Sequence, residues 1–97
     1  MKIVIVGAGG QGAIVADALR AANADAIGFV DDGREGVVAG LPILGSIAGL
    51  AGIAHDAIVV AIGDNAARRA RTLAFEAAGE RIVTARHPWS SIAPDAE

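Results

Sequence analysis

The chain has 97 residues, of which 54% are hydrophobic and 3% aromatic, and its 8 basic and 11 acidic side chains give a formal net charge of −3. This length suits one small domain; it carries no cysteine for disulfides or thiolate metal sites, and no apolar run approaches the roughly 20 residues of a membrane span. The acidic balance disfavours nucleic-acid binding, which needs clustered Lys and Arg, and no signal peptide is evident, so we expect a soluble, cytoplasmic protein.

Five apolar, β-branched segments are predicted to form strands. They are residues 2–6, 26–30, 41–45, 57–63 and 81–85. The continuous apolar runs at residues 2–6 and 57–63 are typical of parallel strands buried on both faces. Pro42 indicates that the third strand is an edge or irregular one, and the preceding residues 33–40 are expected to form a loop.

Two segments have apolar residues at helical spacing: residues 13–22 and 66–78. Asn23 is a plausible end for the first helix. Asp64 or Asn65 is expected to cap the second helix, and Gly79 to stop it. Ser46 can cap a brief helical turn before the fourth strand.

Strands that alternate with helices at this spacing form one parallel sheet with helices on both faces. We therefore predict an α/β fold, a Rossmann-like open parallel sheet flanked by helices, with the strand order third, second, first, fourth, fifth. The ligand crevice of such a sheet lies at the carboxyl ends of the strands, where the chain order switches direction. Three loops fall on that edge: GAGGQG, Asp-Asp and Gly-Asp-Asn.

The loop GAGGQG has the spacing Gly-x-Gly-x-x-Gly between a predicted strand and a predicted helix. Gly7 permits a tight turn, Gly9 leaves room for a phosphate, and Gly12 lets the helix sit close to the strand. Backbone N–H groups and the positive end of the helix then face an anion. The alternative is a tight turn that holds no ligand.

Asp31 and Asp32 follow Gly12 by 19 and 20 residues, where dinucleotide-binding folds place a carboxylate that accepts hydrogen bonds from a ribose. A solvated turn is the alternative. Gly63 would let the backbone approach a ligand from the other side of the crevice. Asn65 either contacts that ligand or only caps its helix, as does the neighbouring Asp64.

The remaining polar residues give no sign of catalysis or metal binding. His55 precedes a strand and is expected at the surface, and His87 has no metal-ligating residue at a suitable spacing. Arg68 and Arg69 could reach a phosphate, although a solvated helix face is the favoured reading. Trp89 is expected to make a packing contact. We assign no catalytic residue, metal or bound cofactor to this chain.

Five segments, in order, resemble the N-terminal half of the PglD/NeuD-type sugar acyltransferases: KIVIVGAGGQG, IGFVDD, GLPILGS, IVVAIGDNAARR and HPWSSIAPDAE. The resemblance implies that residues 1–86 form a domain that binds a nucleotide-activated amino sugar, typically a UDP-sugar. It implies contacts from the glycine loop, the paired aspartates and the fourth-strand loop. The residues implied by the resemblance are Gly9, Gly10, Gln11, Asp31, Asp32 and Gly63. With Gly7, Gly12 and Asn65 from the loop patterns above, they make up the nine predicted site residues. The family commonly has His in place of Gln11, and Gln cannot titrate.

The same resemblance implies that residues 87–97 are a linker and the first hexapeptide unit of a left-handed β-helix that is otherwise missing. In that family the β-helix binds acetyl-CoA, supplies a histidine general base and forms trimers. We therefore expect this chain to bind a UDP-linked amino sugar without catalysing acetyl transfer, as a monomer or a weak self-associate. The alternatives are a free-standing NAD- or NADP-binding module and a ligand-free interaction domain.

Overall fold

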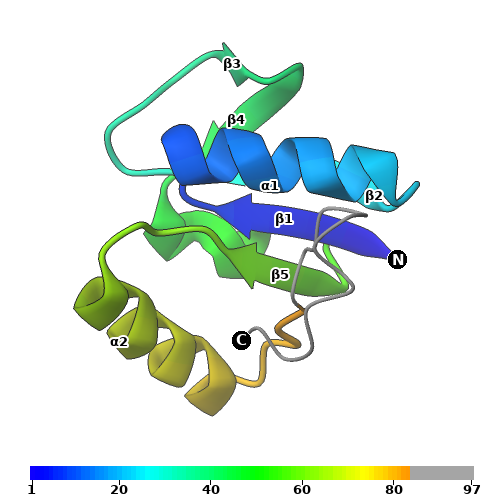
Figure 1. Ribbon diagram of the computed structural model, residues 1–97. Helices are drawn as coiled ribbons and strands as arrows, with labels where there is room; N and C mark the ends of the chain where they lie inside the picture. The colour runs from blue at the N-terminus through cyan, green and yellow to red at the C-terminus, as the bar shows by residue number, and fades with distance from the viewer. Residues whose placement is uncertain (84–97) are drawn as a thin grey trace, which may run out of the picture.

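The computed structural model describes residues 1–83, which form a five-stranded sheet flanked by helices (Figure 1). The strands are β1 (Lys2–Val6), β2 (Asp25–Val30), β3 (Val37–Val38), β4 (Leu41–Gly45) and β5 (Ala57–Val60). The helices are α1 (Gly10–Ala21), the 3-10 helix η1 (Ile47–Gly52) and α2 (Asn65–Ala77). The linker and hexapeptide unit predicted at residues 87–97, with His87 and Trp89, lie outside the described residues.

The strand order is β3-β4-β2-β1-β5, and every neighbouring pair is parallel except β3 with β4. This confirms the predicted order of the first four segments. The predicted fifth strand is reduced, within the described residues, to an isolated parallel bridge between Ile82 and Ile58 on β5. Because β2 and β5 lie on opposite sides of β1, the chain order switches direction at the carboxyl end of β1.

The segment before β4 is not the loop that the sequence predicted. Val37 and Val38 pair with β4 in antiparallel register, joined by a two-residue turn at Ala39 and Gly40, whose φ angles are 50° and 83°. Positive φ at both central residues is typical of the turns that match the twist of a hairpin. Of the two readings of Pro42, the edge strand is wrong because β3 covers that side of β4, whereas the irregular strand is confirmed by the register shift in the pairing of β4 with β2.

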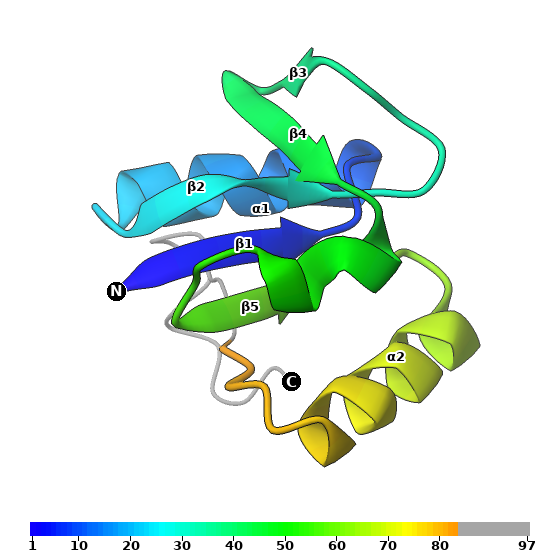
Figure 2. The same ribbon diagram turned by 180° about the vertical axis from the view of Figure 1, so that it is seen from behind.

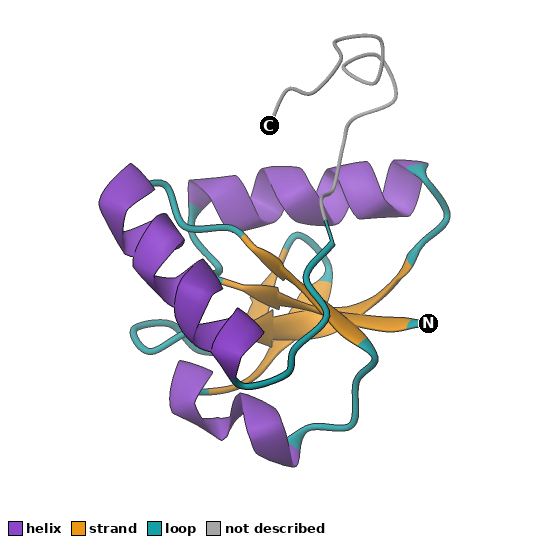
Figure 3. Ribbon diagram, turned by 90° about the horizontal axis from the view of Figure 1, so that it is seen from below, coloured by secondary structure: helices purple, strands orange, loops and turns teal. Residues whose placement is uncertain are grey.

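Alternating residues of the central strand β1 pack into one hydrophobic cluster on each face of the sheet. Ile3 and Ile5 on β1 pack in a cluster with Phe29 and the α1 residue Leu19. On the opposite face, a second cluster contains Val4, Val6, Val30, Leu50 and Ile58. In Figure 3 the sheet is accordingly seen between α1 on one side and η1 on the other, and Figure 2 shows η1 in front of β1. Within residues 1–83 no helix has the length and apolar character needed to cross a membrane.

The helix ends agree with most of the predicted signals. Asn23 has a φ of 58° just beyond α1, and Gly79 has a φ of 87° just beyond α2. The carboxylate of Asp64 accepts hydrogen bonds from the N–H groups of Ala66 and Ala67, as expected of a cap. Helix α1 begins at Gly10, three residues earlier than predicted, so the glycine loop continues directly into its first turn.

Ser46 is the N-cap residue of η1, as predicted, but it does not cap the helix through its side chain. Instead Asp32 Oδ1 accepts from the N–H of Ile47 at 2.9 Å. A carboxylate 15 residues away in sequence thus satisfies the helix end and ties the loop after β2 to η1.

The prediction that His55 lies at the surface is also wrong. Its side chain is 9% exposed and its Nε2 lies 2.7 Å from Oε1 of Glu80, while Nδ1 lies 2.6 Å from the carbonyl oxygen of Ile53. Only the imidazolium donates from both ring nitrogens to these two acceptors. Burial lowers the pKa of His55, but the hydrogen bonds to Glu80 and Ile53 outweigh it, and the net pKa is raised.

We predict that Glu80→Gln destabilises the domain in a pH-dependent way. A raised histidine pKa stabilises the fold fully below the unfolded value of about 6.5, and this contribution is lost as the pH rises through the folded pKa. Urea denaturation should show a deficit of about 1 kcal/mol for Glu80→Gln at pH 6, shrinking by pH 8. The exposed Glu76→Gln on α2 is the control and should follow the wild type at both pH values. A deficit independent of pH would contradict the charged pair.

Candidate functional site

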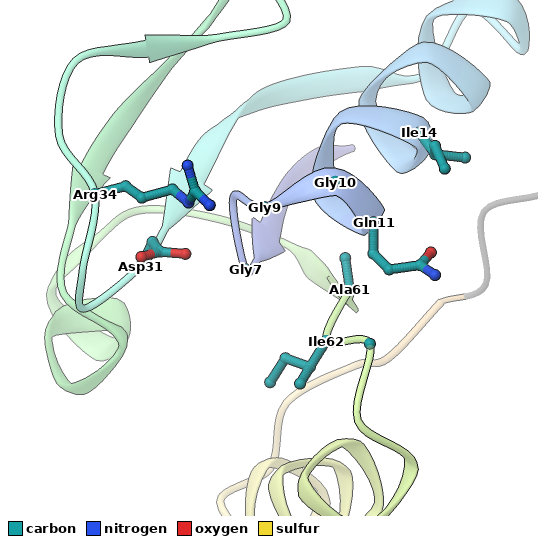
Figure 4. Close-up of a pocket in the computed structure, with 10 residues that line it drawn as sticks. Gly7, Gly9, Gly10, Gln11, Ile14, Asp31, Arg34, Ala61 and Ile62 are labelled. Carbon is teal, nitrogen blue, oxygen red and sulfur yellow. The ribbon is translucent and has the colours of Figure 1, made fainter.

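A cavity of about 680 Å³ opens at the carboxyl ends of β1, β2 and β5 (Figure 4). It lies where the chain order switches direction, which is where open α/β sheets bind their ligands. Ten residues line it: Gly7, Gly9, Gly10, Gln11, Ile14, Asp31, Arg34, Ala61, Ile62 and Gly63. Six of the nine residues predicted for the site, from three separate loops, therefore share one cavity.

The turn from β1 into α1 tolerates only glycine at two positions. Gly7 has a φ of 104°, and a Cβ there would lie 2.7 Å from the carbonyl oxygen of Ala61. A Cβ on Gly12 would lie 2.1 Å from the carbonyl oxygen of Gly7. Gly12 is a buried residue of α1 and does not line the cavity. Its part is the close packing of α1 on β1, which holds the helix end at the cavity.

The N-terminus of α1 faces the cavity without a side-chain cap. Its N-cap is Gly9, no side chain of residues 1–83 caps it, and its first turn holds no acidic residue. The first N–H groups of a helix have no partner within the helix and carry partial positive charge. Gly9 and Gly10 also leave the approach open, so this end of the cavity suits a phosphate.

Asp31 connects the loop after β2 to the glycine loop. Its Oδ2 accepts from the N–H of Ala8 at 2.8 Å, and its Oδ1 accepts from the N–H of Gly33 at 2.8 Å. The Ala8 hydrogen bond is the largest cause that holds the pKa of Asp31 below its ordinary value, with burial opposing and Gly33 and Arg34 assisting. The ionised carboxylate thus fixes the cavity wall and still lines it.

Two of the predicted residues are used elsewhere. Asp32 caps η1 and lies 4.0 Å from the guanidinium of Arg71, so its side chain lines a neighbouring cavity instead. Asn65 begins α2, and its Oδ1 accepts from Arg68 at 2.5 Å. Neither residue lines the glycine-loop cavity.

Comparison with known proteins gives the chain a family. Residues 2–72 match the PglD N-terminal domain. The chain belongs to the PglD N-terminal domain family. This confirms the resemblance drawn from the sequence motifs. No curated protein matches the chain significantly.

Two solved structures extend the family relationship to almost the whole chain. The acetyltransferase domain of PglB from Neisseria gonorrhoeae FA1090 is 33% identical, with a TM-score of 0.81 over 90% of this chain and 44% of that one. A mutant of perosamine N-acetyltransferase from Caulobacter crescentus, solved with CoA and GDP-perosamine, is 31% identical, with a TM-score of 0.82 over 91% of this chain and 43% of that one. The chain therefore spans less than half the length of these relatives.

Sequence reasoning missed four residues that line the cavity of this PglD N-terminal domain: Ile14, Arg34, Ala61 and Ile62. The sequence predicts Ala61 and Ile62 in the fourth strand, but β5 ends at Val60 and leaves them at the cavity. Arg34 follows the paired aspartates in a segment interpreted only as a loop. The available signal was a cation two residues after a pair of carboxylates at the predicted ligand edge.

Proposed function

We propose that this PglD N-terminal domain binds a nucleotide-linked amino sugar as the substrate-holding part of a sugar N-acetyltransferase. The carrying observation is the convergence of the uncapped α1 N-terminus, the ionised Asp31 and the Ala61–Gly63 segment on one cavity. A helix end suits the diphosphate, and a carboxylate oxygen can accept a hydroxyl hydrogen bond. Ile14 and Ile62 provide an apolar wall.

The sequence resemblance and the relatives point to different nucleotide bases. The resemblance implies a UDP-sugar, whereas the perosamine N-acetyltransferase was solved with GDP-perosamine. The helix end and glycine loop address the diphosphate, which both nucleotides share. We propose a UDP-linked amino sugar as the substrate and make GDP the direct competitor in the test.

Acetyl transfer is assigned to the enzyme as a whole rather than to the described cavity. Attack by a sugar amine on acetyl-CoA needs a general base whose pKa lies near the working pH. Asp31 is a poor base because its pKa is lowered and both of its oxygens accept backbone hydrogen bonds. Gln11 cannot titrate. The cavity therefore binds the substrate, and acetyl-CoA is the proposed co-substrate of the whole enzyme.

Calorimetric titration of the purified chain tests the proposal. We expect saturable heat with UDP and a UDP-linked 4-amino sugar and none with NAD. Stronger binding of GDP than of UDP would mean that the substrate carries guanine and not uracil, and the proposed function would stand. Binding of NAD alone would identify a dinucleotide module, and no heat with any nucleotide would indicate an interaction domain.

A further inference from the structure

Arg34 stands at the junction of two cavities. Beside the glycine-loop cavity lies a second one of about 580 Å³, lined by the loop after β2, by Ile43 and Gly45 of β4, and by Ser46. The two sets of lining residues have only Asp31 and Arg34 in common. A ligand that extended from one cavity into the other would therefore pass this pair.

Within the described part of the fold, the guanidinium of Arg34 acts only through its charge, which helps to lower the pKa of Asp31. Within residues 1–83 it forms no ion pair and no hydrogen bond, whereas Arg20, Arg68 and Arg71 each have a polar partner. Its Nη2 lies 3.8 Å from the position that a Cβ on Gly9 would occupy. Figure 4 shows the side chain reaching toward the glycine loop from the opposite wall, above Asp31.

The charges around the two cavities make Arg34 important for binding an anionic ligand. Arg34 is the one basic residue among the described residues that line either cavity, against the carboxylates of Asp31, Asp32 and Glu35. A dianionic ligand would meet net repulsion there without it. A guanidinium binds phosphate oxygens bidentately, through two parallel N–H donors, which a carboxylate-rich wall cannot do.

We propose that Arg34 is a substrate-binding residue that holds the diphosphate of the nucleotide sugar from the side opposite the α1 N-terminus. The inference rests on the proposed function. A nucleotide sugar consists of two bulky, largely uncharged ends joined by a charged diphosphate, and within residues 1–83 these two neighbouring cavities have Arg34 as the one cation between them. The match of that pattern to the ligand is what assigns the diphosphate to Arg34.

Calorimetry with UDP and GDP on four proteins tests this assignment: wild type, Arg34→Ala, Arg34→Lys and Arg69→Ala. Arg69 is an exposed residue of α2 outside both cavities, so its variant carries the same charge change without touching the site. Arg34→Ala should lower the affinity for whichever nucleoside diphosphate binds the wild type by about 10- to 100-fold. Arg34→Lys should recover part of that loss. Arg69→Ala should stay within about twofold of the wild type.

The salt dependence gives an independent readout. The affinity of the wild type should fall more steeply with NaCl concentration than that of Arg34→Ala, because one fewer cation meets the ligand in the variant. If the wild type binds a nucleotide diphosphate and Arg34→Ala binds it equally well, the assignment fails while the proposed function stands. An equal loss in Arg69→Ala would also overturn it, since the effect would then be one of overall charge. If the wild type binds neither UDP nor GDP, both fail.

Discussion

Gly12→Ala should strongly destabilise this domain. A Cβ at position 12 would lie 2.1 Å from the carbonyl oxygen of Gly7 and 3.1 Å from Cε1 of Phe29, whose side chain is fully buried. The first contact is with backbone, so relief requires α1 to move away from β1. Overpacking costs about 1–3 kcal/mol and more where backbone must shift, and a chain of this length has roughly 5–15 kcal/mol of stability in all. We expect a loss of about 3 kcal/mol or more in urea denaturation followed by circular dichroism.

Gly10→Ala is the matched control for that result. Gly10 lies in the first turn of the same helix, and a Cβ there would meet nothing within 4 Å. Alanine restricts the unfolded chain and favours the helix, so the variant should be unchanged or up to about 1 kcal/mol more stable. If Gly12→Ala were as stable as Gly10→Ala, the close packing of α1 on β1 would be wrong, and with it the position of the helix end at the cavity.

The parts of this fold that follow from local patterns were predictable from the sequence. Residues 2–6 do not alternate between apolar and polar side chains. This pattern correctly predicts a strand buried on both faces. The glycine spacing located the β1–α1 turn, and the strand order followed from the βαβ connections. Together these patterns correctly predict that Gly7, Asp31 and Gly63 lie at one edge of the sheet.

The errors occur where a distant residue determines the local structure. The cap of η1 is one case, because the N–H of Ile47 donates to Asp32, 15 residues away, and the side chain of Ser46 makes no capping hydrogen bond. His55 was expected at the surface, but Glu80, 25 residues later, buries its ring in a hydrogen-bonded pair. The β3 hairpin depends on Ala39 in a left-handed conformation, which alanine does not favour intrinsically. Residue spacing cannot predict these contacts, because each depends on the tertiary structure.

Asp31→Asn should both weaken the fold and disturb the binding cavity at neutral pH. The carboxylate accepts from two backbone N–H groups, one on each of the two loops that form the cavity wall. An amide presents only one acceptor oxygen, so one of those N–H groups would face an NH2 group. Hydrogen bonds to charged groups contribute about 1.5–3 kcal/mol, and we expect a loss in that range in urea denaturation at pH 7. Asp25→Asn, an exposed change on β2, the strand that ends just before Asp31, is the control and should lose less than about 0.5 kcal/mol.

The pH dependence of this variant separates a charge effect from a change of shape. The pKa of Asp31 is lowered in the folded state, chiefly by the N–H of Ala8. Its contribution is therefore complete above the unfolded value of about 3.9 and is lost as the pH falls through the folded pKa. The difference in unfolding free energy between wild type and Asp31→Asn should be constant from pH 7 to pH 5 and shrink below about pH 4. A difference that persisted undiminished in acid would mean that the side chain acts through its fit and not its charge. The cavity would then lack the anchored carboxylate on which the proposed contact with a nucleotide hydroxyl depends.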